Sequence, residues 1–125
     1  MNVIKHSEAP RFDAGGTTVT GYAAPSRGAA DVHLWHLDLA PGSTSPMHHM
    51  NCEEVFLVLA GRVAAAVGGS ERELSAGDCL ILPAETPFTL RVLGDEPCRA
   101  VACVPAGPLA TLDPDGATFP PPWAQ

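Results

Sequence analysis

The stretch SPMHHMNCEEVFLVLAG, residues 45–61, places two adjacent histidines ahead of a glutamate and an apolar run. In an extended strand, successive side chains point to opposite faces. One face carries the residues with even numbers, which are His48, Met50, Cys52, Glu54, Phe56 and Val58. Because Phe56 and Val58 are apolar, this face is predicted to point into the protein. We therefore expect Glu54 and His48 in an apolar interior, and His49 and Glu53 on the outside.

Proline and glycine divide the rest of the chain into short segments. There are 13 prolines and 12 glycines, and the segments between them are rich in β-branched and apolar residues. This spacing is typical of an all-β sandwich or barrel. The predicted strands cover residues 17–23, 32–40, 53–61, 62–69, 71–77, 78–84, 87–94 and 98–105. Glycine-containing turns are predicted at residues 68–70 and 76–78, because short glycine turns favour hairpins.

The segment after the last predicted strand differs from the rest. It covers residues 106–125, of which residues 113–125 contain several prolines, and proline lacks the N–H group that a central strand needs. We interpret this segment as an extended C-terminal arm, held to the barrel by Phe119 and Trp123. Asp113 and Asp115 are interpreted as turn residues, since a calcium loop would need more oxygen ligands.

The composition limits the class of protein. A length of 125 residues suits a single domain, residues 1–125. Seven basic against 14 acidic residues give a net charge of −7, which disfavours nucleic acid and anionic membranes as partners. The sequence has no long apolar run and no secretory signal at its start, so we expect a cytoplasmic protein.

The four cysteines form no C-x-x-C pair, so they are predicted to be reduced and mostly buried. Cys79 and Cys103 in particular lie within apolar runs, as small core residues do. His33 and His36 flank Trp35 and are interpreted as residues at the rim of a packed aromatic side chain.

Two motifs in the chain resemble those of the cupin superfamily. The first cupin motif runs Gly, five residues, His-x-His, three or four residues, Glu, six residues and Gly. Gly42, His48, Glu54 and Gly61 follow that spacing, and Met50 stands in the place of the second histidine.

The second cupin motif runs Gly-Asp, four residues, Pro-x-Gly, two residues, His, three residues and Asn. Here Gly77-Asp78 and Pro83 match, and the substituted positions are Glu85 for glycine, Phe88 for histidine and Val92 for asparagine. The resemblance covers residues 30–105 and implies a cupin-type barrel, that is, a double-stranded β-helix or jelly roll. The chain is similar to small bacterial cupins whose set of metal ligands is incomplete.

The family's metal site uses three histidines and a glutamate, of which only His48 and Glu54 remain. Met50 is a poor ligand for Mn, Fe(II) or Zn, and Phe88 is none. His49 could join the site only through a bulge, and Cys52 only as a thiolate. We therefore predict that the protein has no metal and no other cofactor; any bound metal would use His48 and Glu54.

His48 and Glu54 then form a candidate acid/base couple in an apolar pocket. Trp35, Met50, Phe56 and Phe88 are expected to line the pocket and to suit a hydrophobic or aromatic substrate. The preferred hypothesis is a non-redox enzyme, a cyclase, isomerase or lyase, that acts on a small molecule. The alternatives are a ligand-binding or structural cupin without turnover, and a metal-dependent oxygenase. Exposed apolar residues at 55, 57 and 59 favour a homodimer.

Overall fold

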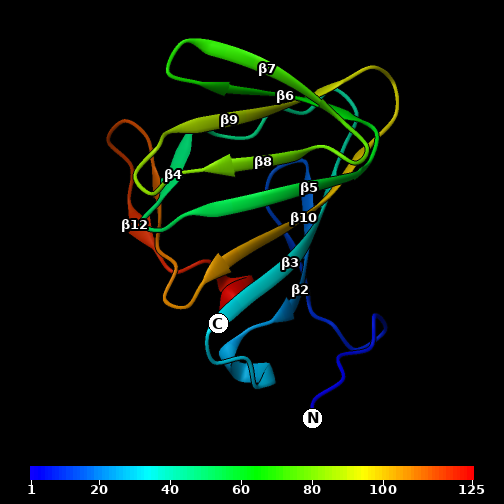
Figure 1. Cartoon of the computed structure of the whole chain (residues 1–125), viewed down its shortest axis with the longest axis vertical. Helices are drawn as coiled ribbons and strands as arrows, with labels where there is room; N and C mark the ends of the chain where they lie inside the picture. Colours follow the sequence, from blue (N-terminus) through cyan, green and yellow to red (C-terminus); the bar gives the residue numbers. More distant parts are fainter.

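Two six-stranded antiparallel sheets make up the computed structural model, which describes all residues from 1 to 125 (Figure 1). The first sheet has the order β1 (Arg11–Asp13), β2 (Thr17–Ala23), β3 (Val32–Leu39), β10 (Cys98–Pro105), β5 (Glu54–Ala60) and β8 (Cys79–Leu82). The second has the order β12 (Thr118–Phe119), β11 (Ala110–Leu112), β4 (His48–Met50), β9 (Phe88–Leu93), β6 (Arg62–Val67) and β7 (Ser70–Ser75). Two 3-10 turns complete the chain, η1 (Pro25–Arg27) and η2 (Pro122–Ala124).

The core lies between the two sheets and follows the alternation of the strands. In β3 every second side chain is buried, from His33 through Trp35 and Leu37 to Leu39. A cluster of 17 buried residues, contributed by both sheets, fills the interior. The predicted all-β, double-sheet jelly roll is therefore confirmed.

All eight predicted strands are present, and their bounds differ from the prediction by at most a few residues. The glycine turn between β6 and β7 is also present, with Gly68 and Gly69 both at positive φ. Three short strands, β1, β11 and β12, were not predicted because three residues or fewer carry little periodicity. Two of them belong to the C-terminal segment, where β12 is the edge strand of the second sheet.

The stretch that contains His48 and Glu54 is two strands and not one. Residues 51–53 leave the extended conformation, so that β4 belongs to the second sheet and β5 to the first. The two sheets face each other, and the interior faces of β4 and β5 therefore both point toward the core. His48 and Glu54 consequently share one interior although they lie on opposite sheets.

Gly61 forms the turn that reverses the chain from β5 into β6. Its φ is +76°, and a Cβ atom at this position would collide with the carbonyl oxygen of Pro97. Only glycine meets both requirements without strain. Gly61, the second glycine of the first motif, is therefore needed for the backbone conformation of this turn and not for the chemistry of the site.

Two predictions about single side chains are wrong. Cys79 is exposed, because it shares the outward face of edge strand β8 with Ile81, although all four cysteines are free as expected. His33 is not at a rim: it is only 2% exposed, and neither of its ring nitrogens has a hydrogen-bond partner. Its position in the inward series of β3 explains its burial. His36 is on the opposite face of that strand, with its Nδ1 atom 3.4 Å from a carboxylate oxygen of Asp38.

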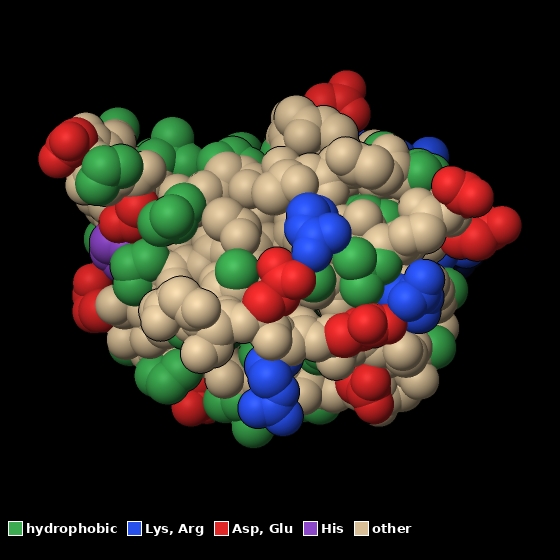
Figure 2. Space-filling view, turned by 90° about the horizontal axis from the view of Figure 1, so that it is seen from above, with side chains coloured by type: hydrophobic (Ala, Val, Ile, Leu, Met, Phe, Trp, Pro, Cys, Tyr) green, Lys and Arg blue, Asp and Glu red, His purple; other side chains and the backbone are tan.

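Charged side chains are mixed on the surface. Figure 2 shows basic side chains standing singly among acidic ones on the face seen from above. Two ion pairs on the second sheet have the same mixed character: Arg62 with Glu73 joins neighbouring strands β6 and β7, and Arg91 with Glu71 reaches from β9 across β6 to β7. No helix of the structure has the length and hydrophobicity to cross a membrane. The cytoplasmic location and the absence of nucleic acid as a partner stay predictions.

Candidate functional site

A cavity of about 310 Å³ opens between the two sheets. Its volume is at the low end of the range for small-molecule sites. All six residues predicted to form the pocket line it: Trp35, His48, Met50, Glu54, Phe56 and Phe88. Trp35, Glu54 and Phe56 come from the first sheet, and His48, Met50 and Phe88 from the second.

The C-terminal segment supplies another part of the wall, which was not predicted from the sequence. The residues that it contributes are Ala110, Leu112, Phe119, Pro121 and Trp123. The ring of Trp123 packs edge-on against Trp35 and Phe12, with centroid distances of 6.3 Å to both. Its carbonyl accepts a hydrogen bond of 2.9 Å from Arg27, and its buried Nε1 atom has no acceptor. Phe119 and Trp123, predicted only as anchors, thus also form the site.

Glu54 is a buried acid without a partner. It is 3% exposed, and its Oε2 atom has no hydrogen bond. Burial in apolar surroundings disfavours the carboxylate and raises the pKa of Glu54 to about 8. The side chain is therefore mainly a neutral carboxylic acid near pH 7, able to donate a proton.

The pKa of His48 is shifted in the opposite direction to that of Glu54. Its pKa is lowered, chiefly because burial disfavours the imidazolium, while the hydrogen bond to Pro46 acts in the other direction. Its Nδ1 atom lies 2.8 Å from the carbonyl oxygen of Pro46. A carbonyl oxygen only accepts, so the proton of the neutral ring is on Nδ1 and Nε2 carries a lone pair. His48 is therefore a neutral base.

His48 and Glu54 do not form a hydrogen bond with each other. His48 bonds to the backbone, and Glu54 bonds to no residue of the chain. Burial alone causes the raised pKa of Glu54, and His48 has no part in that shift. The two side chains instead line one cavity from opposite sheets, so that a ligand could contact both.

The residues present do not fit the metal site of the family. Phe88 pairs with His48 across β4 and β9, and its ring lies over the imidazole at a centroid distance of 4.4 Å. Phe88 is 2% exposed and also packs against Phe56, so it fills the place of the missing histidine. No group of three or more His, Cys, Asp or Glu side chains is arranged to hold a metal ion.

The two residues considered as substitute ligands also point elsewhere. His49 and Cys52 do not line the cavity. Cys52 lies in the bend between β4 and β5, where burial raises the pKa of its thiol and disfavours the thiolate that a metal would need.

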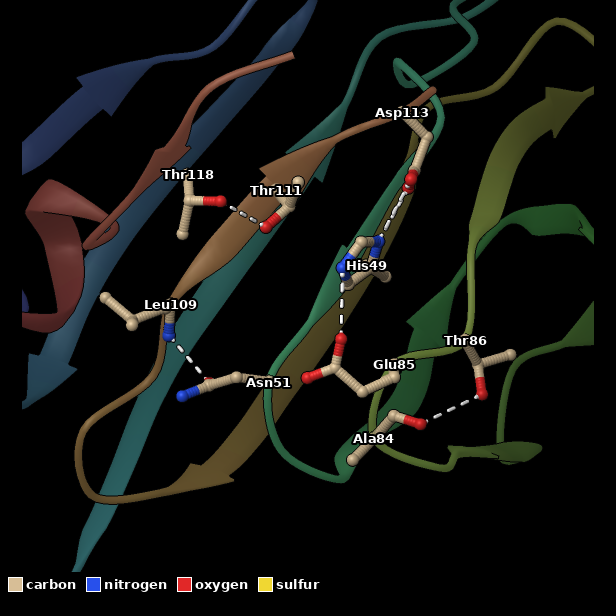
Figure 3. Close-up of polar contacts among 9 residues, drawn as sticks. All are labelled: His49, Asn51, Ala84, Glu85, Thr86, Leu109, Thr111, Asp113 and Thr118. Carbon is tan, nitrogen blue, oxygen red and sulfur yellow. Dashed lines mark hydrogen bonds and ion pairs between the residues drawn. The ribbon is translucent and has the colours of Figure 1, made fainter. Parts of the chain in front are cut away.

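His49 lies on the outer face of β4, as its parity predicts, and holds two other segments there (Figure 3). Its Nδ1 atom is 2.9 Å from a carboxylate oxygen of Asp113, and its Nε2 atom is 3.2 Å from Glu85. Glu85 has a φ of +60° at the place of the family's turn glycine, and its N–H donates to the carbonyl of Met50. Asp113 is in a turn, as predicted, but its contact with His49 joins residues 64 positions apart.

Comparison with known proteins agrees with this fold. The family model described as "Cupin domain" matches residues 35–104, more than half of the chain. The chain therefore belongs to the cupin domain family.

Auxin-binding protein 5 of Zea mays is 42% identical over 53 residues, which are 42% of this chain and 34% of that protein. The chain thus spans about a third of the length of this curated relative.

Two solved structures share the fold. A polyketide cyclase, RemF, of Streptomyces resistomycificus has a TM-score of 0.76 and 19% identity, covering 98% of this chain and 88% of that one. A sugar phosphate isomerase from a cupin superfamily, of Silicibacter pomeroyi, has a TM-score of 0.73 and 17% identity, covering 94% and 91%. These likenesses concern the fold alone.

Proposed function

We propose that the chain is a small-molecule enzyme without redox chemistry, in which Glu54 is the general acid and His48 the general base. The observation that carries the proposal is the opposite displacement of two pKa values in one apolar cavity. Burial raises the pKa of Glu54 to about 8 and lowers that of His48. Titratable groups whose environments move their pKa values apart are typical of acid/base pairs.

The reaction that these groups support is proton transfer beside a carbonyl group. Nε2 of His48 removes a proton from the neighbouring carbon, and the electrons of that C–H bond form a carbon–carbon double bond. The carbonyl π electrons take the proton of Glu54 and form an O–H bond. The result is an enol, an imidazolium and a carboxylate, with no change in oxidation state.

Return of both protons completes the catalytic cycle. If the imidazolium protonates another carbon and the carboxylate recovers the enol proton, the product is an isomer. If the enol carbon attacks a second carbonyl, a ring closes; the imidazolium protonates the new alkoxide and the carboxylate recovers the enol proton. Isomerases and cyclases of this kind need no metal, and we propose that this chain uses none.

Proton exchange into a simple ketone tests this proposal. The bicyclic ketone 2-tetralone in deuterated buffer reports on C–H removal beside its carbonyl by proton magnetic resonance. We expect faster exchange with the parent protein and loss of that acceleration in His48→Phe and Glu54→Gln. Glu53→Gln, at an exposed neighbouring position, is the matched control and should exchange like the parent. Absence of acceleration while the ketone binds would contradict the enzyme proposal.

Binding without turnover is the second candidate function. It is favoured by the sequence relatives, which carry the name auxin-binding protein. The same experiment separates the two functions: ligand-induced shifts in the cavity with no acceleration of exchange would favour a binding protein.

We also propose that the chain forms a homodimer through the outer face of the first sheet. Leu57, Leu59 and Ile81 are 42%, 48% and 61% exposed on this face. Edge strand β8 has no partner on its outer side, and the same edge of a second copy can continue the antiparallel sheet. Light scattering should give a dimer for the parent and a monomer for Leu57→Glu with Ile81→Glu; a monomeric parent would contradict the proposal.

A further inference from the structure

The cavity wall lacks the positively charged side chains that a site for an anion would need. None of its 20 lining residues is a lysine or an arginine. Thirteen of them are hydrophobic, so the wall also offers few polar groups that could replace the water around a charged ligand. A carboxylate or phosphate that entered would be desolvated without a counter-charge, which is strongly unfavourable.

His48 does not supply that counter-charge. Burial lowers the pKa of His48, and its Nδ1 proton is already committed to the carbonyl of Pro46. Glu54 adds no positive charge in either protonation state, and if it ionised it would repel an anion. The net charge of −7 on the whole chain acts in the same direction.

Glu54 does offer a hydrogen bond. It is buried and unpaired, and a buried polar group without a partner is costly. A carbonyl or hydroxyl oxygen of a ligand can accept the proton of the neutral acid and so remove that cost. An apolar molecule without oxygen would leave Glu54 as it is.

From the absence of a cationic side chain and the unpaired Glu54, we infer that the ligand of the cavity is an uncharged compound with a carbonyl or hydroxyl group, and that carboxylates and phosphates are rejected. This inference rests on the proposed small-molecule site and narrows its substrate class. It separates neutral ketones and phenols from acids of the same shape.

A matched pair of probes tests the inference. The amide 2-naphthamide and the acid anion 2-naphthoate have the same ring and nearly the same shape, but only the second is charged near neutral pH. Isothermal titration of the parent protein should show 2-naphthoate binding at least about 100-fold more weakly than the amide, as expected for an unpaired buried charge.

One substitution can supply the missing charge without a change in the core. Leu112 lines the cavity yet is 37% exposed, so a lysine there can keep its stem on the wall and its ammonium at the surface. Leu112→Lys should raise the affinity for 2-naphthoate at least about tenfold. The control is Leu109→Lys, which changes the net charge by the same amount at a 39% exposed position outside the cavity wall. This control should leave the preference for 2-naphthamide over 2-naphthoate unchanged.

The outcomes separate this inference from the proposed function. Equal or tighter binding of 2-naphthoate to the parent would overturn the inference, while exchange into 2-tetralone would still decide the enzyme proposal. An equal gain in affinity for 2-naphthoate from Leu112→Lys and Leu109→Lys would also overturn the inference, since the gain would then come from the net charge of the whole protein and not from the cavity wall. Binding of neither probe would overturn the inference together with the proposed small-molecule site.

Discussion

Replacing Glu54 by glutamine should change how the stability of the protein depends on pH. The pKa of Glu54 is about 8 in the folded protein, against an ordinary value of 4.5. Between these two values the folded chain holds a proton that the unfolded chain has already lost. Stability therefore falls as pH rises through this window, and the loss is complete above about pH 8.

The gap between 4.5 and about 8, at about 1.4 kcal/mol for each pH unit, corresponds to on the order of 5 kcal/mol. That is a large share of the roughly 5–15 kcal/mol that stabilises a typical domain. Because Glu54 is 3% exposed, solvent screening reduces this contribution little. Glutamine does not titrate, so Glu54→Gln should gain stability relative to the parent as pH rises across the window.

Urea unfolding of both proteins at several pH values between about 4.5 and 8.5 measures this difference. His33 and His48 have lowered pKa values, so each reduces stability as pH falls through its unfolded value of 6.5. Both proteins contain these histidines, and their effect cancels in the difference. Glu53→Gln, at an exposed position, should follow the parent. A difference between the parent and Glu54→Gln that stays constant across the whole range would refute the argument that Glu54 is a neutral buried acid.

Three further predictions concern the metal and the C-terminal segment. The protein purified without added metal should contain no stoichiometric transition metal, because Met50 and Phe88 occupy two ligand places; about one equivalent of Fe, Mn, Ni, Cu or Zn by plasma mass spectrometry would contradict this. Phe88→His combined with Met50→His should bind Zn²⁺ or Mn²⁺ more tightly than the parent by isothermal titration, and no gain would mean that His48 and Glu54 do not converge. Asp113→Asn should weaken the contact with His49 by about 1–3 kcal/mol and speed amide exchange in residues 110–119, whereas Asp115→Asn at an exposed position should not.

The strands and the inward face of the site could be predicted from the sequence because both depend on local pattern. Alternation points Trp35 and Glu54 toward the core, whichever of the two sheets their strands join. The bend between β4 and β5 therefore did not affect the prediction. The register of two motifs also identified Phe88 as the residue in the third histidine place, where it packs on His48.

What the sequence could not predict depends on pairing between distant segments. The contact of His49 with Asp113 is set by how β11 pairs with β4, and the place of Trp123 in the cavity wall is set by its packing against Trp35 and Phe12. Neither alternation nor turn residues contain that information. The missing bond between His48 and Glu54 has a similar cause, because the two side chains face the cavity from opposite sheets.

The position of Phe119, Pro121 and Trp123 in the cavity wall has a consequence for the order of events during synthesis. Strands β2 to β10 leave the ribosome before these residues do, so a nascent barrel has an open side next to Trp35 until they arrive. The hydrogen bond from Arg27 to the carbonyl of Trp123 can form only after this later segment is synthesised, because the two residues are 96 positions apart in the chain. Because closure of such distant contacts is slow, ligand affinity should be among the last properties that the folding protein acquires.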